Sequence, residues 1–276
     1  MTLYFDCVRR VPVLLLLLTA AACTAPTSEF TRRAAALNFT AALVRGDPFD
    51  HVVFGGAPQP GSRRLHVYLD GDGIPWLGGR PARDPTPRKP LVLSLMAHDP
   101  VASIYLGRPC YHGLVDTPGC STVLWTSGRY SEAVVASMAA AVRRVTADTG
   151  IDEIAWFGYS GGGSLAVLLA SRLPESTAVV TVSANLDIDA WTDAHGDLPL
   201  TRSLNPARQG PLPDRILQIH YAGGRDRVVP VDVVRKGVTG AGRVVVMPNY
   251  DHVCCWEKAW PSILAEIERA TRAATR

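Results

Sequence analysis

One short segment of the chain combines a nucleophilic residue with the small neighbours that would expose it. Residues 158–162 read Gly-Tyr-Ser-Gly-Gly, and they lie between an apolar run at 154–157 and another at 165–169. A serine in the pattern G-x-S-x-G, at a sharp turn from a strand into a helix, presents its hydroxyl as a nucleophile. We therefore predict that Ser160 attacks substrate. A phosphate-binding loop is excluded, because no Gly-Lys-Ser/Thr follows the glycines.

This strand, nucleophile and helix resemble the α/β-hydrolase superfamily, and in particular its small exported serine hydrolases. The resemblance covers the chain from about Leu65 to the C-terminus. It implies an acid and a histidine that follow the serine in the order Ser, Asp, His. Asp226 comes after an apolar strand and a glycine turn, and His252 comes after the last strand and the turn 248–251. The resemblance thus implies a triad of Ser160, Asp226 and His252.

The other histidines do not fit that order. His220 lies inside a strand, where a buried structural role is expected, and the remaining five are His51, His66, His98, His112 and His195, which precede the serine or the acid. In the triad, the histidine takes the serine proton and the aspartate holds the histidine ring in place.

The oxyanion of the tetrahedral intermediate needs backbone N–H donors. Gly161, directly after the nucleophile, provides one, and the resemblance places the other at Asp72, in the loop 69–73 after a strand. The family often has His-Gly at the positions of Asp70 and Gly71, so the two acids in this loop, Asp70 and Asp72, are a departure from its pattern. Three roles remain open for these carboxylates: they repel an anionic substrate, they hold a cationic one, or they only bond the backbone of their turn.

Strands alternate with helical segments along the chain, which predicts an α/β fold with a mostly parallel central sheet flanked by helices. Residues 30–60 are expected to add an antiparallel strand pair at the sheet edge. The segment 184–213 lies where hydrolases insert lids, but it is short, so we expect a short lid or none. Strands are expected at 65–69, 101–106, 154–157, 178–182, 216–220 and 243–247, and helices at 90–98, 131–148, 162–172, 231–236 and 256–274.

The N-terminus has the pattern of an export signal. Arg9 and Arg10 precede an apolar run at 11–18 and then small residues, which predicts a signal peptide over 1–22. Cys23 follows Ala-Ala-Ala and resembles the lipid-carrying cysteine of a bacterial lipobox, although Ala20 replaces the usual leucine. We therefore expect a lipoprotein of the bacterial cell envelope, anchored to a membrane through Cys23; ordinary secretion is the alternative. A tether over 23–29 and a single domain over 30–276 would follow.

Export places the remaining four cysteines in an oxidising compartment, which favours disulfides. Cys110 and Cys120 enclose a loop suited to a local bridge. Cys254 and Cys255 are adjacent, and they either bridge each other or pair elsewhere. Buried free thiols are the alternative. No cysteine pair has the spacing of a zinc site, and we expect neither a metal nor a cofactor.

The charge pattern excludes one class of partner. The net charge is +3, and no run of the 28 basic residues exceeds two, so the chain has no footprint for nucleic acid. The expected activity is that of a carboxylesterase that forms an acyl-enzyme from a small acyl ester. Two alternatives remain: acyl transfer or peptide hydrolysis on the same triad, and a non-catalytic envelope lipoprotein that keeps the fold for binding.

Overall fold

A computed structural model describes residues 25–56 and 61–274 of the chain; the predicted signal peptide and Cys23 lie outside this part. Its centre is an eight-stranded sheet in the order β1-β2-β6-β3-β7-β8-β9-β10. The six strands from β6 to β10 in this order are parallel, and β1 and β2 add an antiparallel pair at one edge. This confirms the predicted α/β fold. No helix in the described ranges is long and apolar enough to span a membrane.

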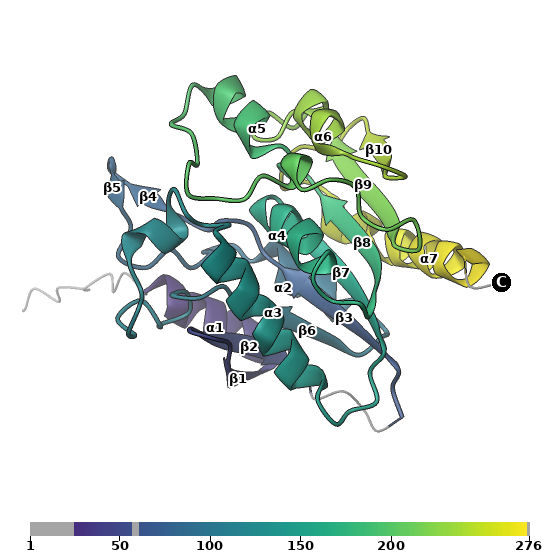
Figure 1. Ribbon diagram of the computed structural model, residues 1–276, viewed down its shortest axis with the longest axis horizontal. Coiled ribbons are helices and arrows are strands. Elements are labelled where there is room, and N and C mark those ends of the chain that lie inside the picture. The colour runs from purple at the N-terminus through teal and green to yellow at the C-terminus, as the bar shows by residue number, and fades with distance from the viewer. Residues whose placement is uncertain (1–24, 57–60, 275–276) are drawn as a thin grey trace, which may run out of the picture.

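The strands are β1 (Thr40–Arg45), β2 (Asp50–Gly55), β3 (Arg64–Leu69), β6 (Ser103–Leu106), β7 (Glu153–Tyr159), β8 (Ser176–Val182), β9 (Leu217–Gly223) and β10 (Arg243–Met247), and a separate two-stranded hairpin consists of β4 (Trp76–Leu77) and β5 (Arg80–Pro81). The helices are α1 (Pro26–Ala36), α2 (Leu91–Ala97), α3 (Glu132–Thr146), α4 (Gly161–Ala170), α5 (Ile188–His195), α6 (Val231–Gly237) and α7 (Trp256–Ala274), with short 3-10 turns at Thr122–Trp125 and Pro206–Arg208. Figure 1 shows their arrangement.

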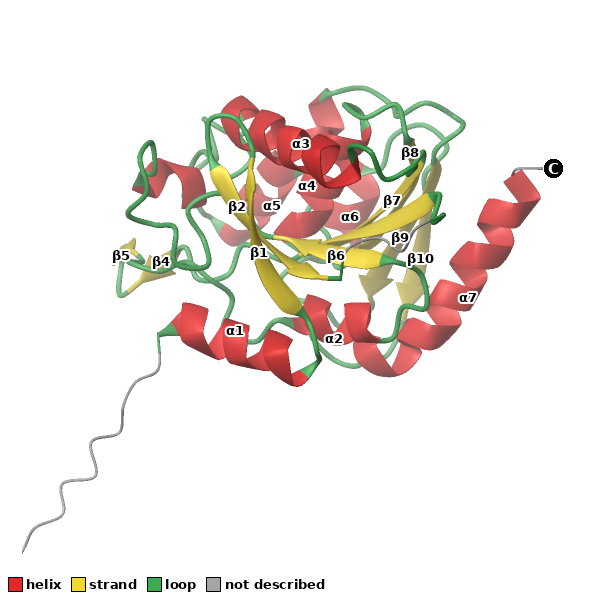
Figure 2. Ribbon diagram, turned by 90° about the horizontal axis from the view of Figure 1, so that it is seen from below, coloured by secondary structure: helices red, strands yellow, loops and turns green. Residues whose placement is uncertain are grey.

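Helices cover both faces of the sheet, as Figure 2 shows: α3, α4, α5 and α6 lie on one side, and α1, α2 and α7 on the other. The alternation of side chains in β3 reflects this layering. Leu65 and Val67 pack in the core beneath α3 and α4, whereas Tyr68 packs in the core beneath α2 and α7. A strand that buries both faces is apolar throughout, which is why the sequence marks these strands as short apolar runs.

The fold starts earlier than predicted. Residues 26–29, expected in a tether, form the first turn of α1. The backbone N–H and hydroxyl of Thr27 donate to Asp84 Oδ2 at 3.0 and 2.8 Å. Phe30 is fully buried, with its ring 5.1 Å from that of Phe54. Phe30 and Ala34 are the buried residues of α1, and they dock this helix onto the core beneath α2 and α7.

The connection between β8 and β9 contains α5, which the sequence analysis did not predict. Asp187 caps this helix by accepting from the backbone N–H groups of Asp189 and Ala190 at 3.1 and 3.2 Å. An aspartate before a helix satisfies N–H groups that have no partner within the helix. Within the described residues this connection forms no separate lid, in agreement with the expectation of a short lid or none.

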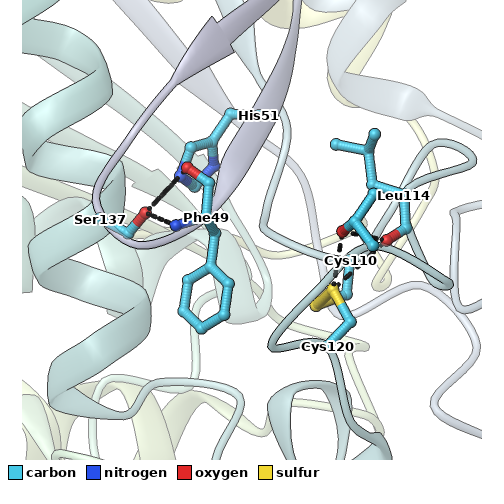
Figure 3. The surroundings of a disulfide bond; sticks show 7 residues. Phe49, His51, Cys110, Leu114, Cys120 and Ser137 are labelled. Carbon is cyan, nitrogen blue, oxygen red and sulfur yellow. Dashed lines mark hydrogen bonds between the residues drawn. A yellow bond between two sulfur atoms is a disulfide. The ribbon is translucent and has the colours of Figure 1, made fainter.

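The loop after β6 is held by a disulfide and by a buried histidine. Cys110 and Cys120 are bridged, as predicted. Figure 3 shows this bridge near His51, whose ring nitrogens lie 2.9 Å from Gly107 O and from Ser137 Oγ. Burial lowers the pKa of His51 to about 4, so the ring is neutral near pH 7. This second serine–histidine pair is fully buried and joins β2, α3 and the loop after β6.

Candidate active site

Ser160 occupies a tight turn between β7 and α4. Its backbone has φ of 51° and ψ of −127°, a region that costs energy for a residue with a Cβ and recurs at functional sites. A Cβ on Gly158 would lie 2.5 Å from Gly162 O, and one on Gly162 would overlap Leu69 O. The glycines of the motif are therefore required by close approach of the backbone.

Asp226 and His252 are brought together from two neighbouring strands. Asp226 follows β9, His252 follows β10, and Asp226 Oδ2 lies 2.9 Å from His252 Nδ1. The other carboxylate oxygen accepts from the backbone N–H groups of Val228 and Val229, both at 2.8 Å. Because Asp226 is buried and held at both oxygens, it fixes the orientation of the histidine ring.

Ser160 and His252 line one cavity of about 550 Å³. The ring of Tyr159 lies 5.1 Å from that of His252 and forms part of the same wall. These residues and the loop after β3 all stand at the carboxyl ends of parallel strands, the edge at which ligands bind in open α/β sheets. The structure thus gathers the three predicted triad positions at one edge of the sheet.

The loop after β3 lies against the nucleophile. A Cβ on Gly71 would be 3.3 Å from Ser160 Cβ, and one on Gly161 would overlap the carboxylate of Asp72. Gly161 begins α4, so its N–H has no acceptor within the helix. No described residue accepts a hydrogen bond from the Asp72 N–H. The loop after β3 thus lies close to the Ser160 turn, and the two amides remain candidates for the oxyanion hole.

None of the three roles considered for the Asp72 carboxylate describes it. One oxygen lies 2.8 Å from Arg108 Nη1, and the other lies 2.6 Å from Arg129 Nη1. The hydroxyl of Tyr130 donates to the same carboxylate at 2.6 Å. Burial alone would raise the pKa of Asp72, but Arg129 and Arg108 lower it to about 2. Asp72 is thus a half-buried anion that holds two buried arginines.

Arg108 and Tyr111 also hold the backbone of the loop after β3. Arg108 Nη2 donates to Asp70 O, and the hydroxyl of Tyr111 donates to Asp72 O, both at 3.0 Å. Arg129 Nε donates to Thr126 O at 2.7 Å. The sequence analysis did not assign Arg108 or Arg129 to Asp72. The acid itself was the available signal, since a largely buried carboxylate that stays ionised requires a cation.

Asp70 has a different environment from Asp72. Its Oδ1 accepts from the backbone N–H of Gly71 at 2.8 Å, which is the turn-bonding role considered from the sequence. Its Oδ2 is buried and has no hydrogen-bond partner among the described residues. Burial raises the pKa of Asp70 to about 7, and the Gly71 N–H and Arg108 only partly oppose this effect.

We predict that Asp70→Asn stabilises the protein in a pH-dependent manner. The unfolded chain ionises Asp70 near pH 4, whereas the folded protein does so near pH 7, so the wild type loses stability as pH rises through this window. The asparagine variant lacks that loss. Its advantage in the free energy of unfolding should grow between pH 4 and 7, to on the order of a few kcal/mol, and stay constant above. Urea unfolding at several pH values measures it, with exposed Asp214→Asn as the control; equal pH profiles for Asp70→Asn and wild type would contradict it.

The loop that carries His252 is closed by local contacts. Cys254 and Cys255 form a disulfide with each other, which is one of the pairings left open by the sequence, and the peptide bond between them is cis. The Asp251 carboxylate accepts from the backbone N–H groups of Val253 and Cys254 at 2.8 and 2.7 Å. The Cys254–Cys255 disulfide lies in the chain between His252 and Trp256, the first residue of α7.

The predicted structural role of His220 is consistent with its surroundings. Its Nδ1 lies 2.9 Å from Thr181 Oγ1, and burial lowers its pKa to about 4. No group of three or more histidine, cysteine or acidic side chains within the described ranges is arranged to hold a metal ion.

No family model matches the sequence, and no curated protein matches it. Solved structures do match. An esterase from Pyrococcus furiosus is 14% identical with a TM-score of 0.59, over 87% of this chain and 93% of the esterase. A bacterial membrane phospholipase A described as a virulence factor is 17% identical with a TM-score of 0.54, over 91% of both chains. An α/β serine hydrolase homologue from Coxiella burnetii is 16% identical with a TM-score of 0.51, over 84% of this chain and 96% of that one. At these identities the similarity concerns the fold, and the protein has the fold of the α/β hydrolases.

Proposed function

We propose that the protein is a serine hydrolase, and specifically a carboxylesterase that works through an acyl-enzyme. The observation that carries the proposal is the 2.9 Å contact of Asp226 with His252 at the cavity into which the strained Ser160 turn opens. A serine hydroxyl is a weak nucleophile unless a base takes its proton. The contact of His252 with Asp226 at the cavity that Ser160 also lines supports His252 as that base.

Ser160 Oγ attacks the ester carbonyl carbon while the Nε2 atom of His252 takes the hydroxyl proton. The amides of Gly161 and Asp72 stabilise the resulting oxyanion. Collapse of the tetrahedral intermediate breaks the bond to the alcohol, which receives the proton from His252. A water molecule, activated by the same histidine, then releases the carboxylic acid and restores Ser160. Throughout, Asp226 stabilises the imidazolium ring.

Two of the structural neighbours, an esterase and a phospholipase A, act by name on carboxylic esters, which supports esters as the substrate class. An acyl transferase or a peptidase would use the same triad. The absence of a separate lid among the described residues favours substrates that enter an open cavity.

A fluorophosphonate probe tests the proposal directly. The probe reacts with a serine only when a base activates it, so we expect stoichiometric labelling of Ser160, located by mass spectrometry of the labelled peptide. Esters of p-nitrophenol with acyl chains of increasing length then define the acyl preference. Intact, folded protein that neither reacts with the probe nor hydrolyses any ester would favour the non-catalytic binding lipoprotein.

We also propose that the mature protein begins at a lipid-modified Cys23. The support is the sequence pattern, a basic and apolar leader that ends in small residues before a cysteine. Mass spectrometry of the mature N-terminus decides between a lipid anchor and secretion. An unmodified mature protein that starts at another residue would overturn the anchor.

A further inference from the structure

Two cations stand at the catalytic cavity without a counter-ion. Arg88 and Lys89 line the cavity together with Ser160 and His252. Both side chains are exposed, and neither forms an ion pair or a side-chain hydrogen bond with any residue in 25–56 or 61–274. The sequence analysis did not single them out, although Arg-Lys between two prolines is visible in the chain.

The other arginine that lines this cavity already has a counter-ion. Arg129 also lines it, but its guanidinium is held by Asp72, and Asp72 is held in turn by Arg108. Asp70 also lines the cavity, but it is buried and burial raises its pKa to about 7, so it is only partly ionised at neutral pH. The two unpaired cations therefore dominate the charge that a substrate meets at the mouth of the cavity.

The loop that carries these cations is rigid. Prolines at 85, 87 and 90 restrict its backbone, and Pro85 O accepts from the Ile74 N–H at 3.0 Å. The buried Thr86 hydroxyl accepts from the His112 N–H at 2.8 Å. Asp84 is fixed by Thr27 of α1. The loop is thus attached to α1, to the oxyanion loop and to the disulfide-closed loop, so Arg88 and Lys89 project from a preorganised platform.

The catalytic cavity continues into a largely apolar groove of about 900 Å³, in whose lining Arg129 and Asp197 are the charged residues. The cavity and the groove are both lined by Ile74, Arg129 and Trp191, which shows that they adjoin. On the far side the groove is lined by Trp76 and Leu198, whose exposed fractions of 50% and 86% are high for large apolar residues. The cavity that Ser160 lines therefore has a pair of unpaired cations in its wall and adjoins a largely apolar groove.

We propose that the substrate is an amphiphilic acyl ester with an anionic group, a carboxylate or a phosphate. Arg88 and Lys89 bind the anionic group, and the groove lined by Trp76, Trp191 and Leu198 takes the apolar chain. This proposal rests on the proposed esterase function and adds the substrate class to it. Arginine and lysine both bind phosphate and carboxylate oxygens, so the shared feature is the negative charge.

Matched pairs of esters test the proposal. 1-Octanoylglycerol 3-phosphate and 1-octanoylglycerol differ only in a phosphate on the alcohol side. The p-nitrophenyl half-ester of adipic acid and p-nitrophenyl hexanoate differ in a carboxylate on the acyl side. We expect kcat/KM to be higher for the anionic member of at least one pair. In the double variant Arg88→Gln with Lys89→Gln, the ratio of anionic to neutral kcat/KM should fall roughly tenfold, which corresponds to about 1.4 kcal/mol.

The matched control is Arg80→Gln with Arg83→Gln, two exposed cations on the neighbouring hairpin segment that line neither the cavity nor the groove. The control should leave the ratio unchanged. Sodium chloride should reduce the anionic preference of the wild type, because salt screens exposed charges. In Leu198→Asp, the preference for octanoyl over acetyl esters should decrease, because a carboxylate then replaces one of the large apolar side chains of the groove.

The outcomes separate this proposal from the proposed function. Ester hydrolysis that depends on Ser160 but shows no preference for either anionic member, or a preference that survives in Arg88→Gln with Lys89→Gln, would overturn the substrate class and leave the esterase intact. If no ester is hydrolysed, the esterase proposal fails. Calorimetric binding of octyl phosphate and of octanol to the Ser160→Ala variant then still decides the anion site: equal affinities would overturn it, and a stronger affinity for octyl phosphate that is lost with Arg88 and Lys89 would support it.

Discussion

Replacing Ser160 with alanine is expected to lower kcat for ester hydrolysis by about 10⁴-fold or more while the protein remains folded. The variant removes the attacking oxygen but leaves Asp226 and His252 in contact. It also retains the backbone turn into α4, since alanine has the same Cβ as serine. Initial rates with a p-nitrophenyl ester measure the loss, and far-ultraviolet circular dichroism checks the fold.

Ser171→Ala is the matched control, because Ser171 is exposed at the opposite end of the same helix and its hydroxyl donates to Leu168 O at 2.8 Å. Its activity should equal that of the wild type. A Ser160→Ala protein, freed of contaminating esterases, that retained wild-type turnover would show that another group attacks the substrate.

The largest effect on stability is expected from Asp72→Ala. Arg108 and Arg129 are both 5% exposed, and Asp72 is their shared anion. Removing one partner of a buried ion pair leaves an uncompensated charge, which typically costs about 3–5 kcal/mol. Urea unfolding at neutral pH measures this cost. Asp72→Asn keeps a hydrogen-bond acceptor for Tyr130 but loses the charge, so its stability should lie between those of Asp72→Ala and the wild type.

The control for Asp72→Ala is the exposed ion pair of Arg63 with Asp152, whose side chains are 72% and 49% exposed. Exposed pairs contribute little to stability, so Asp152→Ala should change the unfolding midpoint only slightly. Similar midpoints for Asp72→Ala and Asp152→Ala would mean that water reaches the two arginines and replaces the lost carboxylate. The activity of Asp72→Ala should fall as well, because Asp72 supports the loop that carries one of the oxyanion amides.

The elements that could be predicted from the sequence are those with a strong local pattern. The apolar run before Ser160 predicts β7, and the alanine-rich segment after Ser131 predicts α3, whose first turn Ser131 caps through the Val134 N–H. The strand at 243–247 and the helix at 256–274 match β10 and α7 in their bounds. Asp226 and His252 were found through their places after strands, which the parallel topology brings to one edge.

Features that depend on contacts between distant segments could not be predicted in this way. Helix α1 buries only two apolar side chains, so it lacks a clear apolar stripe. Arg108 and Arg129 lie 36 and 57 residues beyond Asp72 in the chain, and only the folded arrangement makes them its partners. The same holds for Arg88 and Lys89, which the chain separates from Ser160 by about seventy residues.

With a lipid on Cys23, the early start of α1 would keep the folded domain close to the membrane surface. Pro26 opens the helix, and Thr27 is bonded to the loop that ends in Arg88 and Lys89. Only three peptide steps separate Cys23 from Pro26, and an extended chain spans at most about 3.5 Å per residue, or about 10 Å in all. With the proposed lipid on Cys23, the start of the fold would stay within that distance of the anchoring leaflet. The catalytic domain would then be confined to amphiphiles in its own membrane, and a flexible insert of about twenty residues before Pro26 should extend its action to vesicles in solution.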